Sequence, residues 1–135
     1  MRFHIIAVLA GSLSLALSVA PAAGAQSPSV APSTTSPDTS AISPEMVSAG
    51  RRIFHGQGTC FGCHGMNLEG GPIAPTLKAH AWKDAKGGEL SAIFWVVTHG
   101  VTGTLMVSHP GGISDAAAAR VAAYVWSVSH RGAKP

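Results

Sequence analysis

Hydrophobic positions recur at helical spacing in three segments of this chain, at about residues 44–54, 89–99 and 115–130. No alternating strand pattern of useful length accompanies them. The apolar face of the first segment includes Gly50, which is costly inside a helix and indicates that another backbone packs closely there. The pattern predicts an all-α fold of three to five helices.

Capping residues mark the ends of these segments. Ser43 stands before Pro44, which gives an N-cap followed by proline at the first helical position. Ser114 and Asp115 give a second start, with a cap and then an acidic residue in the first turn. Gly100 follows the middle segment and is expected to end it. Between the helices, glycine-rich stretches without periodicity predict long loops.

The chain before residue 44 has a different composition. A basic residue at position 2, an apolar run and the sequence Ala23-Gly24-Ala25 predict a signal peptide over 1–25, cleaved after Ala25. An uncleaved N-terminal anchor is the alternative, and only that form would tie the protein to a membrane. Residues 26–43 are rich in Ser, Thr and Pro and predict a flexible linker. The remaining segment, 44–135, is expected to form one small domain.

The two cysteines of the chain lie in the sequence Cys60-Phe61-Gly62-Cys63-His64. This C-x-x-C-H spacing is typical of c-type haem attachment. Two thiols on one helical turn can each add to a vinyl group of the porphyrin, and the following histidine can bind the iron. A zinc site would need further ligands at metal-binding spacing, and a redox dithiol is expected after a strand. The motif therefore favours one covalently attached haem c over both alternatives, and a periplasmic location for the protein.

Charge adds little to this interpretation. Nine Lys and Arg face six Asp and Glu, and the pI of about 9.2 gives the only argument for nucleic-acid binding, which we do not expect. Lys78, Lys83 and Lys86 fall in one stretch. They predict either a solvated loop or a docking patch for an acidic partner.

Over residues 44–130 the chain resembles the class I c-type cytochromes, of the small single-haem bacterial kind. In that family a glycine and an aromatic residue on the first helix meet an apolar residue and a tyrosine on the last. Gly50 and Phe54 match the first pair, and Val121 and Tyr124 match the second. The resemblance implies the cytochrome c fold, wrapped around the haem. It also implies that the carbonyl group of Pro75 accepts a hydrogen bond from the proximal histidine.

The same resemblance places a methionine ligand between the last two helices, where Met106 stands in a glycine-rich loop. A thioether opposite the histidine raises the reduction potential. Family members usually have proline after this methionine, whereas this chain has Val107, which leaves the rigidity of the loop open. His99 and His109 are alternative ligands, and ligation by two histidines would lower the potential.

Trp82 falls where the family often places a residue that touches a haem propionate, although simple packing explains it equally well. The expected function is transfer of single electrons between redox partner proteins, without catalysis by the chain itself. The protein is expected as a monomer or as a subunit of a larger dehydrogenase or oxidase. A peroxidase or ligand-binding protein with a labile sixth site is a further alternative.

Overall fold

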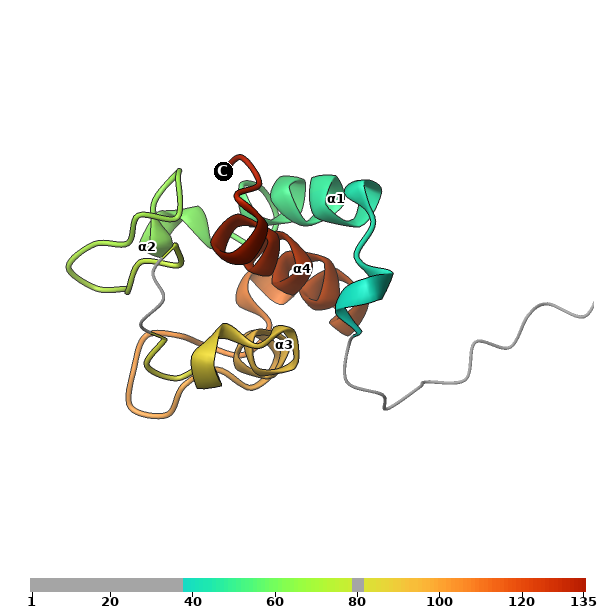
Figure 1. Ribbon diagram of the computed structural model, residues 1–135. Helices are drawn as coiled ribbons and strands as arrows, with labels where there is room; N and C mark the ends of the chain where they lie inside the picture. The colour runs from blue at the N-terminus through green and yellow to red at the C-terminus, as the bar shows by residue number, and fades with distance from the viewer. Residues whose placement is uncertain (1–37, 79–81) are drawn as a thin grey trace, which may run out of the picture. The chain divides into compact units, whose positions relative to one another are not determined.

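The computed structural model describes residues 38–78 and 82–135, and within them the fold is all-α, as predicted. Four α-helices and three short 3₁₀ turns follow one another along the chain, and no strand occurs in these residues (Figure 1). The α-helices are α1 (Pro44–Phe54), α2 (Phe61–His64), α3 (Leu90–His99) and α4 (Asp115–Arg131). The 3₁₀ turns are η1 (Thr39–Ala41), η2 (Lys86–Gly88) and η3 (Pro110–Gly112).

The helix ends lie where the capping residues predicted them. The Ser43 side chain accepts a hydrogen bond from the backbone N–H of Met46 at 3.2 Å, and α1 begins at the next residue. Ser114 accepts one from Ala117 N–H at 3.3 Å at the start of α4. Each cap supplies an acceptor to an N–H group that has no partner inside the helix.

Helices α1 and α4 cross at Gly50, where the sequence pattern indicated a close approach. A Cβ atom on Gly50 would overlap the carbonyl oxygen of Arg120 and would lie 2.8 Å from the Tyr124 Cβ. Beside this contact, the rings of Phe54 and Tyr124 meet edge to face with their centroids 5.6 Å apart. Both rings are fully buried, so this pair forms the centre of the α1–α4 interface.

Helix α4 is the central element of the domain, since both α1 and α3 pack on it (Figure 1). The sequence pattern predicted one buried stripe along it, but an unbroken run from Val121 to Val125 is buried. The run Ala122-Ala123 explains the difference, because alanine is small enough to lie under a neighbouring helix on either side. α4 is thus buried on two faces rather than one.

The packed region includes residues before α1. Ile42 belongs to the hydrophobic core, and Arg131 donates a hydrogen bond to the carbonyl oxygen of Thr39 at 3.3 Å. The proposed signal peptide, 1–25, and the linker up to residue 37 lie outside the described residues, so their boundaries stay predictions. Within 38–78 and 82–135, no helix is long and apolar enough to span a bilayer.

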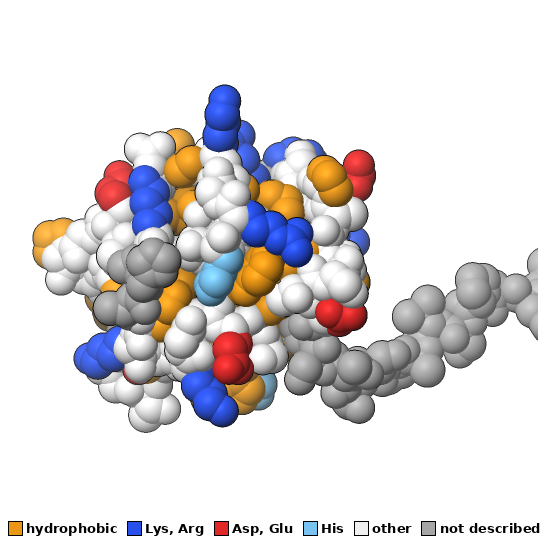
Figure 2. All heavy atoms as spheres, viewed as in Figure 1, with side chains coloured by type: hydrophobic (Ala, Val, Ile, Leu, Met, Phe, Trp, Pro, Cys, Tyr) orange, Lys and Arg blue, Asp and Glu red, His pale blue; other side chains and the backbone are white. Residues whose placement is uncertain are grey.

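Hydrophobic side chains remain at the surface among scattered basic and acidic ones, and several are visible on the face in Figure 2. The most exposed large ones include Leu105 at 70%, and Ile73 and Val107 at 60% each. They lie in the loop after α2 and in the loop before α4, the two segments that carry the residues discussed next.

Candidate haem-binding site

Cys63 and His64 lie in the short helix α2, and Cys60 is its N-cap residue, so the three share one helical turn. Neither cysteine is in a disulfide. Cys60 is half-buried, its thiol points to the Gly58 carbonyl oxygen at 3.4 Å, and burial raises its pKa to about 11. Cys63 is exposed. Because a helical turn places these residues close together, both thiols and the imidazole are available to one flat ligand.

His64 is oriented by the loop that follows it. Its Nδ1 donates a hydrogen bond to the carbonyl oxygen of Pro75 at 2.9 Å, which is the contact implied by the family resemblance. Burial lowers the pKa of the imidazole, and the bond to Pro75 opposes this shift only in part. The neutral ring, with Nε2 free, is the form that binds a metal.

Backbone contacts hold the Pro75 carbonyl in place. Leu68 is fully buried in a left-handed conformation, with φ of 61°. Its carbonyl oxygen accepts bonds from the Leu77 N–H at 2.8 Å and from the Thr76 hydroxyl at 3.1 Å. These two bonds fix the residues immediately after Pro75, so the loop can present that carbonyl to His64.

Met106 lies in the loop between α3 and α4 and is half-buried against the core. The loop closes through a hydrogen bond from the Val101 N–H to the Met106 carbonyl oxygen at 2.8 Å. The Thr104 hydroxyl accepts from the Met106 N–H at 3.1 Å. Thr104 was not identified from the sequence. Serine and threonine hydroxyls in turns commonly accept a hydrogen bond from the backbone N–H two residues later, so the signal was present.

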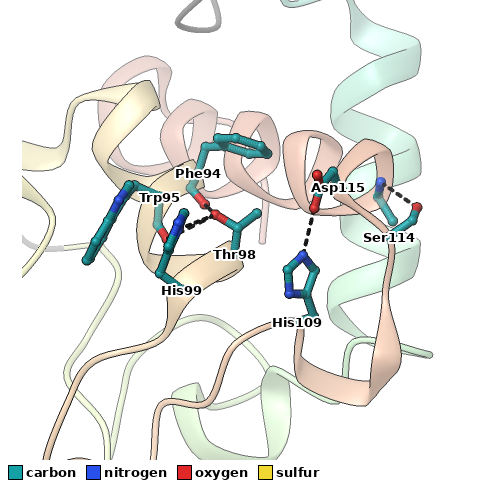
Figure 3. Close-up of polar contacts among 8 residues, drawn as sticks. Phe94, Trp95, Thr98, His99, His109, Ser114 and Asp115 are labelled. Atoms are coloured by element: carbon teal, nitrogen blue, oxygen red, sulfur yellow. Dashed lines mark hydrogen bonds and ion pairs between the residues drawn. The ribbon is translucent and has the colours of Figure 1, made fainter. Parts of the chain in front are cut away.

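His99 and His109, the alternative ligands, both have protein partners (Figure 3). The His99 ring stacks on Trp95 with centroids 4.6 Å apart, and its Nδ1 lies 3.0 Å from the Trp95 carbonyl oxygen. The Nε2 of His109 is 2.7 Å from the Asp115 carboxylate, which faces it from the start of α4. Asp115 therefore has two roles, as a first-turn acid and as the partner of His109.

Trp82 packs against the turn that precedes α3. Gly88, with φ of 76°, lies directly beneath its indole ring, and a Cβ atom there would overlap Nε1. Trp82 is half-buried at the edge of the core. The packing role is therefore present in the structure, while contact with a propionate stays a prediction.

A second histidine–methionine pair lines a cavity of about 450 Å³ at the end of α1, together with Arg51, Arg52 and Asn67. His55 and Met66 are consistent with histidine–methionine ligation by residue type. His55 Nε2 lies 3.4 Å from the Tyr124 hydroxyl, and its Nδ1 is buried without a hydrogen-bond partner.

The donor set fits a c-type haem. Two free thiols and a neutral imidazole share one turn, a methionine lies on a separate loop, and large apolar side chains stand exposed on the loops concerned. A family model described as cytochrome c oxidase, cbb3-type, subunit III, matches residues 45–125. The chain belongs to this family of class I c-type cytochromes.

Solved structures agree with the cytochrome fold. Cytochrome c6 of the diatom Phaeodactylum tricornutum is 30% identical, with a TM-score of 0.52 over 64% of this chain and 97% of that one. Cytochrome cL of the marine methylotroph Methylophaga aminisulfidivorans MPT is 25% identical, with a TM-score of 0.55 over 63% of this chain. This cytochrome spans only 56% of that chain's length. No curated protein sequence matches it.

A chain of the reducing HAO-like protein complex of Kuenenia stuttgartiensis shares the fold at 22% identity, with a TM-score of 0.54 over 70% of this chain and 50% of that one. Its resemblance concerns the fold alone.

Proposed function

We propose that this cytochrome is an exported carrier of single electrons, with one haem c held by Cys60 and Cys63 and with His64 and Met106 as axial ligands. The observation that carries the proposal is the α2 turn, where both thiols stand beside an imidazole whose Nδ1 is bonded to Pro75. The bound haem would supply the one-electron couple between Fe(II) and Fe(III).

Different residues of the chain would attach the haem, bind its iron and shield it from water. Cys60 and Cys63 would hold the haem through two thioether bonds, each formed by adding one S–H across a vinyl double bond, which needs no external oxidant or reductant. His64 offers Nε2 while Pro75 holds its other nitrogen, and a thioether from Met106 favours reduced iron and so a high potential. Apolar side chains around the bound haem would exclude water from the metal. The protein itself makes no bond in a substrate.

Two features favour His64 over His55 as the proximal ligand. His64 directly follows Cys63 in the attachment motif, and its Nδ1 is engaged so that Nε2 is the free nitrogen. In His55 the Nε2 faces Tyr124 instead. Met66 stands only two residues after His64, so it cannot cross to the opposite side of a ring that His64 binds.

Export to the periplasm and cleavage after Ala25 are part of this proposal, because c-type attachment belongs to that side of the membrane. The exposed Lys78, Lys83 and Lys86 would meet acidic redox partners. A tethered subunit of a larger oxidoreductase is the second candidate, since the family is described as an oxidase subunit. In that case, the part of the predicted linker that precedes residue 38 would serve as the tether.

Substitution of Met106 tests the ligation. In the oxidised holoprotein, Met106→Ala should abolish the weak near-infrared sulfur-to-iron band. The potential should fall by tens to hundreds of millivolts, within the range of about 0.8 V that axial ligands span. The reduced variant should bind carbon monoxide, because an open sixth position accepts external ligands.

Met66→Ala and His99→Ala are the controls and should leave the band and the potential nearly unchanged. A band that disappears in Met66→Ala but survives in Met106→Ala would move the ligation to the cavity at the end of α1. Rapid carbon monoxide binding by the unmodified reduced protein would instead support a peroxidase or ligand-binding function.

A further inference from the structure

The Met106 loop meets the rest of the protein at two glycines with positive φ. Gly100, with φ of 73°, ends α3 and lies under the returning chain. A Cβ atom on it would lie 2.5 Å from the Met106 carbonyl oxygen and 2.9 Å from the Ser108 nitrogen. Gly111, with φ of 67°, faces Gln57, and a Cβ atom on it would overlap the Gln57 carbonyl oxygen.

The partner of Gly111 is significant because Gln57 stands three residues before Cys60. The same Cβ atom would also lie 3.3 Å from the Gly58 Cα. Backbone thus rests on backbone between the loop that carries Met106 and the segment that leads into the α2 turn. A backbone neighbour cannot rotate away as a side chain can, so this contact sets how closely the two segments approach.

Between the two glycines the loop is internally braced. The Thr104 hydroxyl donates to the Val101 carbonyl oxygen at 2.8 Å and accepts from the Met106 N–H. Farther on, the His109 N–H donates to the carbonyl oxygen of Val97 at 2.8 Å and so attaches the loop to α3. These contacts make the loop a stiff unit even though Val107 replaces the proline usual in the family. A stiff loop moves as one unit when its backbone contact at Gly100 or Gly111 is displaced.

We propose that Gly100 and Gly111 are positioning residues that set the place of Met106 relative to the Cys60–His64 turn. The inference rests on the proposed role of Met106 as axial ligand. A methyl group at either glycine would push the loop away from the backbone on which it packs and withdraw the Met106 thioether from the iron.

The loop supplies a matched control for each glycine. Gly112 has φ of 71° and Gly103 has φ of 78°, and a Cβ atom on either meets nothing within 4 Å. Alanine costs backbone strain at all four positions, but only at Gly100 and Gly111 would the added Cβ atom also collide with neighbouring backbone atoms. Each glycine is therefore compared with its control: Gly111→Ala with Gly112→Ala, and Gly100→Ala with Gly103→Ala. The difference in effect within a pair reports the backbone collision separately from the backbone strain.

The experiment compares these four holoproteins with the unmodified one by near-infrared absorption, reduction potential and carbon monoxide uptake. Gly111→Ala and Gly100→Ala should lose at least half of the sulfur-to-iron band, have a lower potential and take up carbon monoxide at least tenfold faster than their controls. The controls should keep the band even if their thermal midpoints fall. A purely structural role would lower thermal midpoints in both members of a pair and leave the band intact.

The inference is overturned if the unmodified protein has the sulfur-to-iron band and the band is equally strong in both variants of each pair. That result would leave the proposed function standing. A missing band in the unmodified protein overturns the proposed ligation and the inference with it. If Gly111→Ala gives no holoprotein, the Gly100 and Gly103 pair decides the question by the same criteria.

Discussion

Side chains at the candidate site are oriented mainly by backbone atoms. His64 donates to the Pro75 carbonyl oxygen and the Cys60 thiol points to that of Gly58, while the backbone of Met106 is held by the Thr104 hydroxyl. Such neutral partners carry no charge that changes when the iron changes oxidation state. The environment can therefore stay fixed through the redox cycle, as a carrier of single electrons requires.

The sequence predicted some of these residues and not others. The Cys60–Cys63–His64 spacing follows from local chemistry, because all three residues lie on one helical turn. The packing of Trp82 on Gly88 and the pairing of His109 with Asp115 each join residues only six positions apart, but they depend on the conformation of the loop between them. A sequence pattern carries no signal for such contacts, which form only when the loops take their final shape.

His55 gives a prediction for the dependence of stability on pH. Burial and, second, the charge of Arg51 lower its pKa below the usual 6.5. As the pH falls through 6.5, the unfolded chain binds a proton more readily than the folded one. The free energy of unfolding should therefore decrease from about pH 7 toward pH 5.

Urea unfolding of the holoprotein at several pH values measures this effect. The His55→Gln variant should show a shallower decrease than the unmodified protein over the same interval. His130→Gln, which alters an exposed histidine on α4, is the control and should keep the original slope. Equal slopes for the unmodified protein and His55→Gln would assign the acid sensitivity to other groups.

At the scale of helices, capping and periodicity account for where each element begins and which side it buries. Ser43 and Ser114 mark their helix starts because an N-cap acts within three residues of chain. The second buried face of α4 was not predicted, because an alanine-rich run is equally compatible with a helix that buries only one face. That face depends on a tertiary partner, α3, whose position no local pattern specifies.

The crossing of α1 and α4 predicts a large effect of one methyl group. Gly50→Ala should lower the free energy of unfolding by about 1–3 kcal/mol, the usual cost of overpacking, despite the better helix propensity of alanine. The cause is the overlap with the Arg120 carbonyl oxygen, which cannot move without shifting α4. Chemical denaturation of the holoprotein gives the comparison.

Gly62→Ala is the matched control, because Gly62 is helical and a Cβ atom on it meets nothing within 4 Å. It should be neutral or slightly stabilising. If Gly50→Ala is as stable as Gly62→Ala, α1 and α4 can move apart without loss of stability. That result would contradict the prediction that their close approach at Gly50 is required.

As a whole molecule, the domain is small, and neither cysteine forms a disulfide. Exposed apolar side chains such as Ile73, Leu105 and Val107 indicate a core that the polypeptide does not complete alone. A large apolar cofactor would supply the missing buried surface.

The haem-free protein should therefore lack a stable fold. In the Cys60→Ser/Cys63→Ser double variant, intact mass should show the loss of one haem, and circular dichroism should show no cooperative thermal transition. The unmodified sequence produced without haem attachment controls for the serine substitutions and should behave alike. A cooperative transition near that of the holoprotein, in either sample, would contradict the prediction.

The central position of α4 also has a consequence for the timing of assembly. The chain is synthesised from its N-terminus, and α4, on which both α1 and α3 pack, appears after the other three helices of the described residues. Until residue 131 has emerged, the earlier helices lack the surface against which they are buried. Cys60 and Cys63 are thus presented on an open chain, and the reaction that joins them to haem can precede closure of the domain around it.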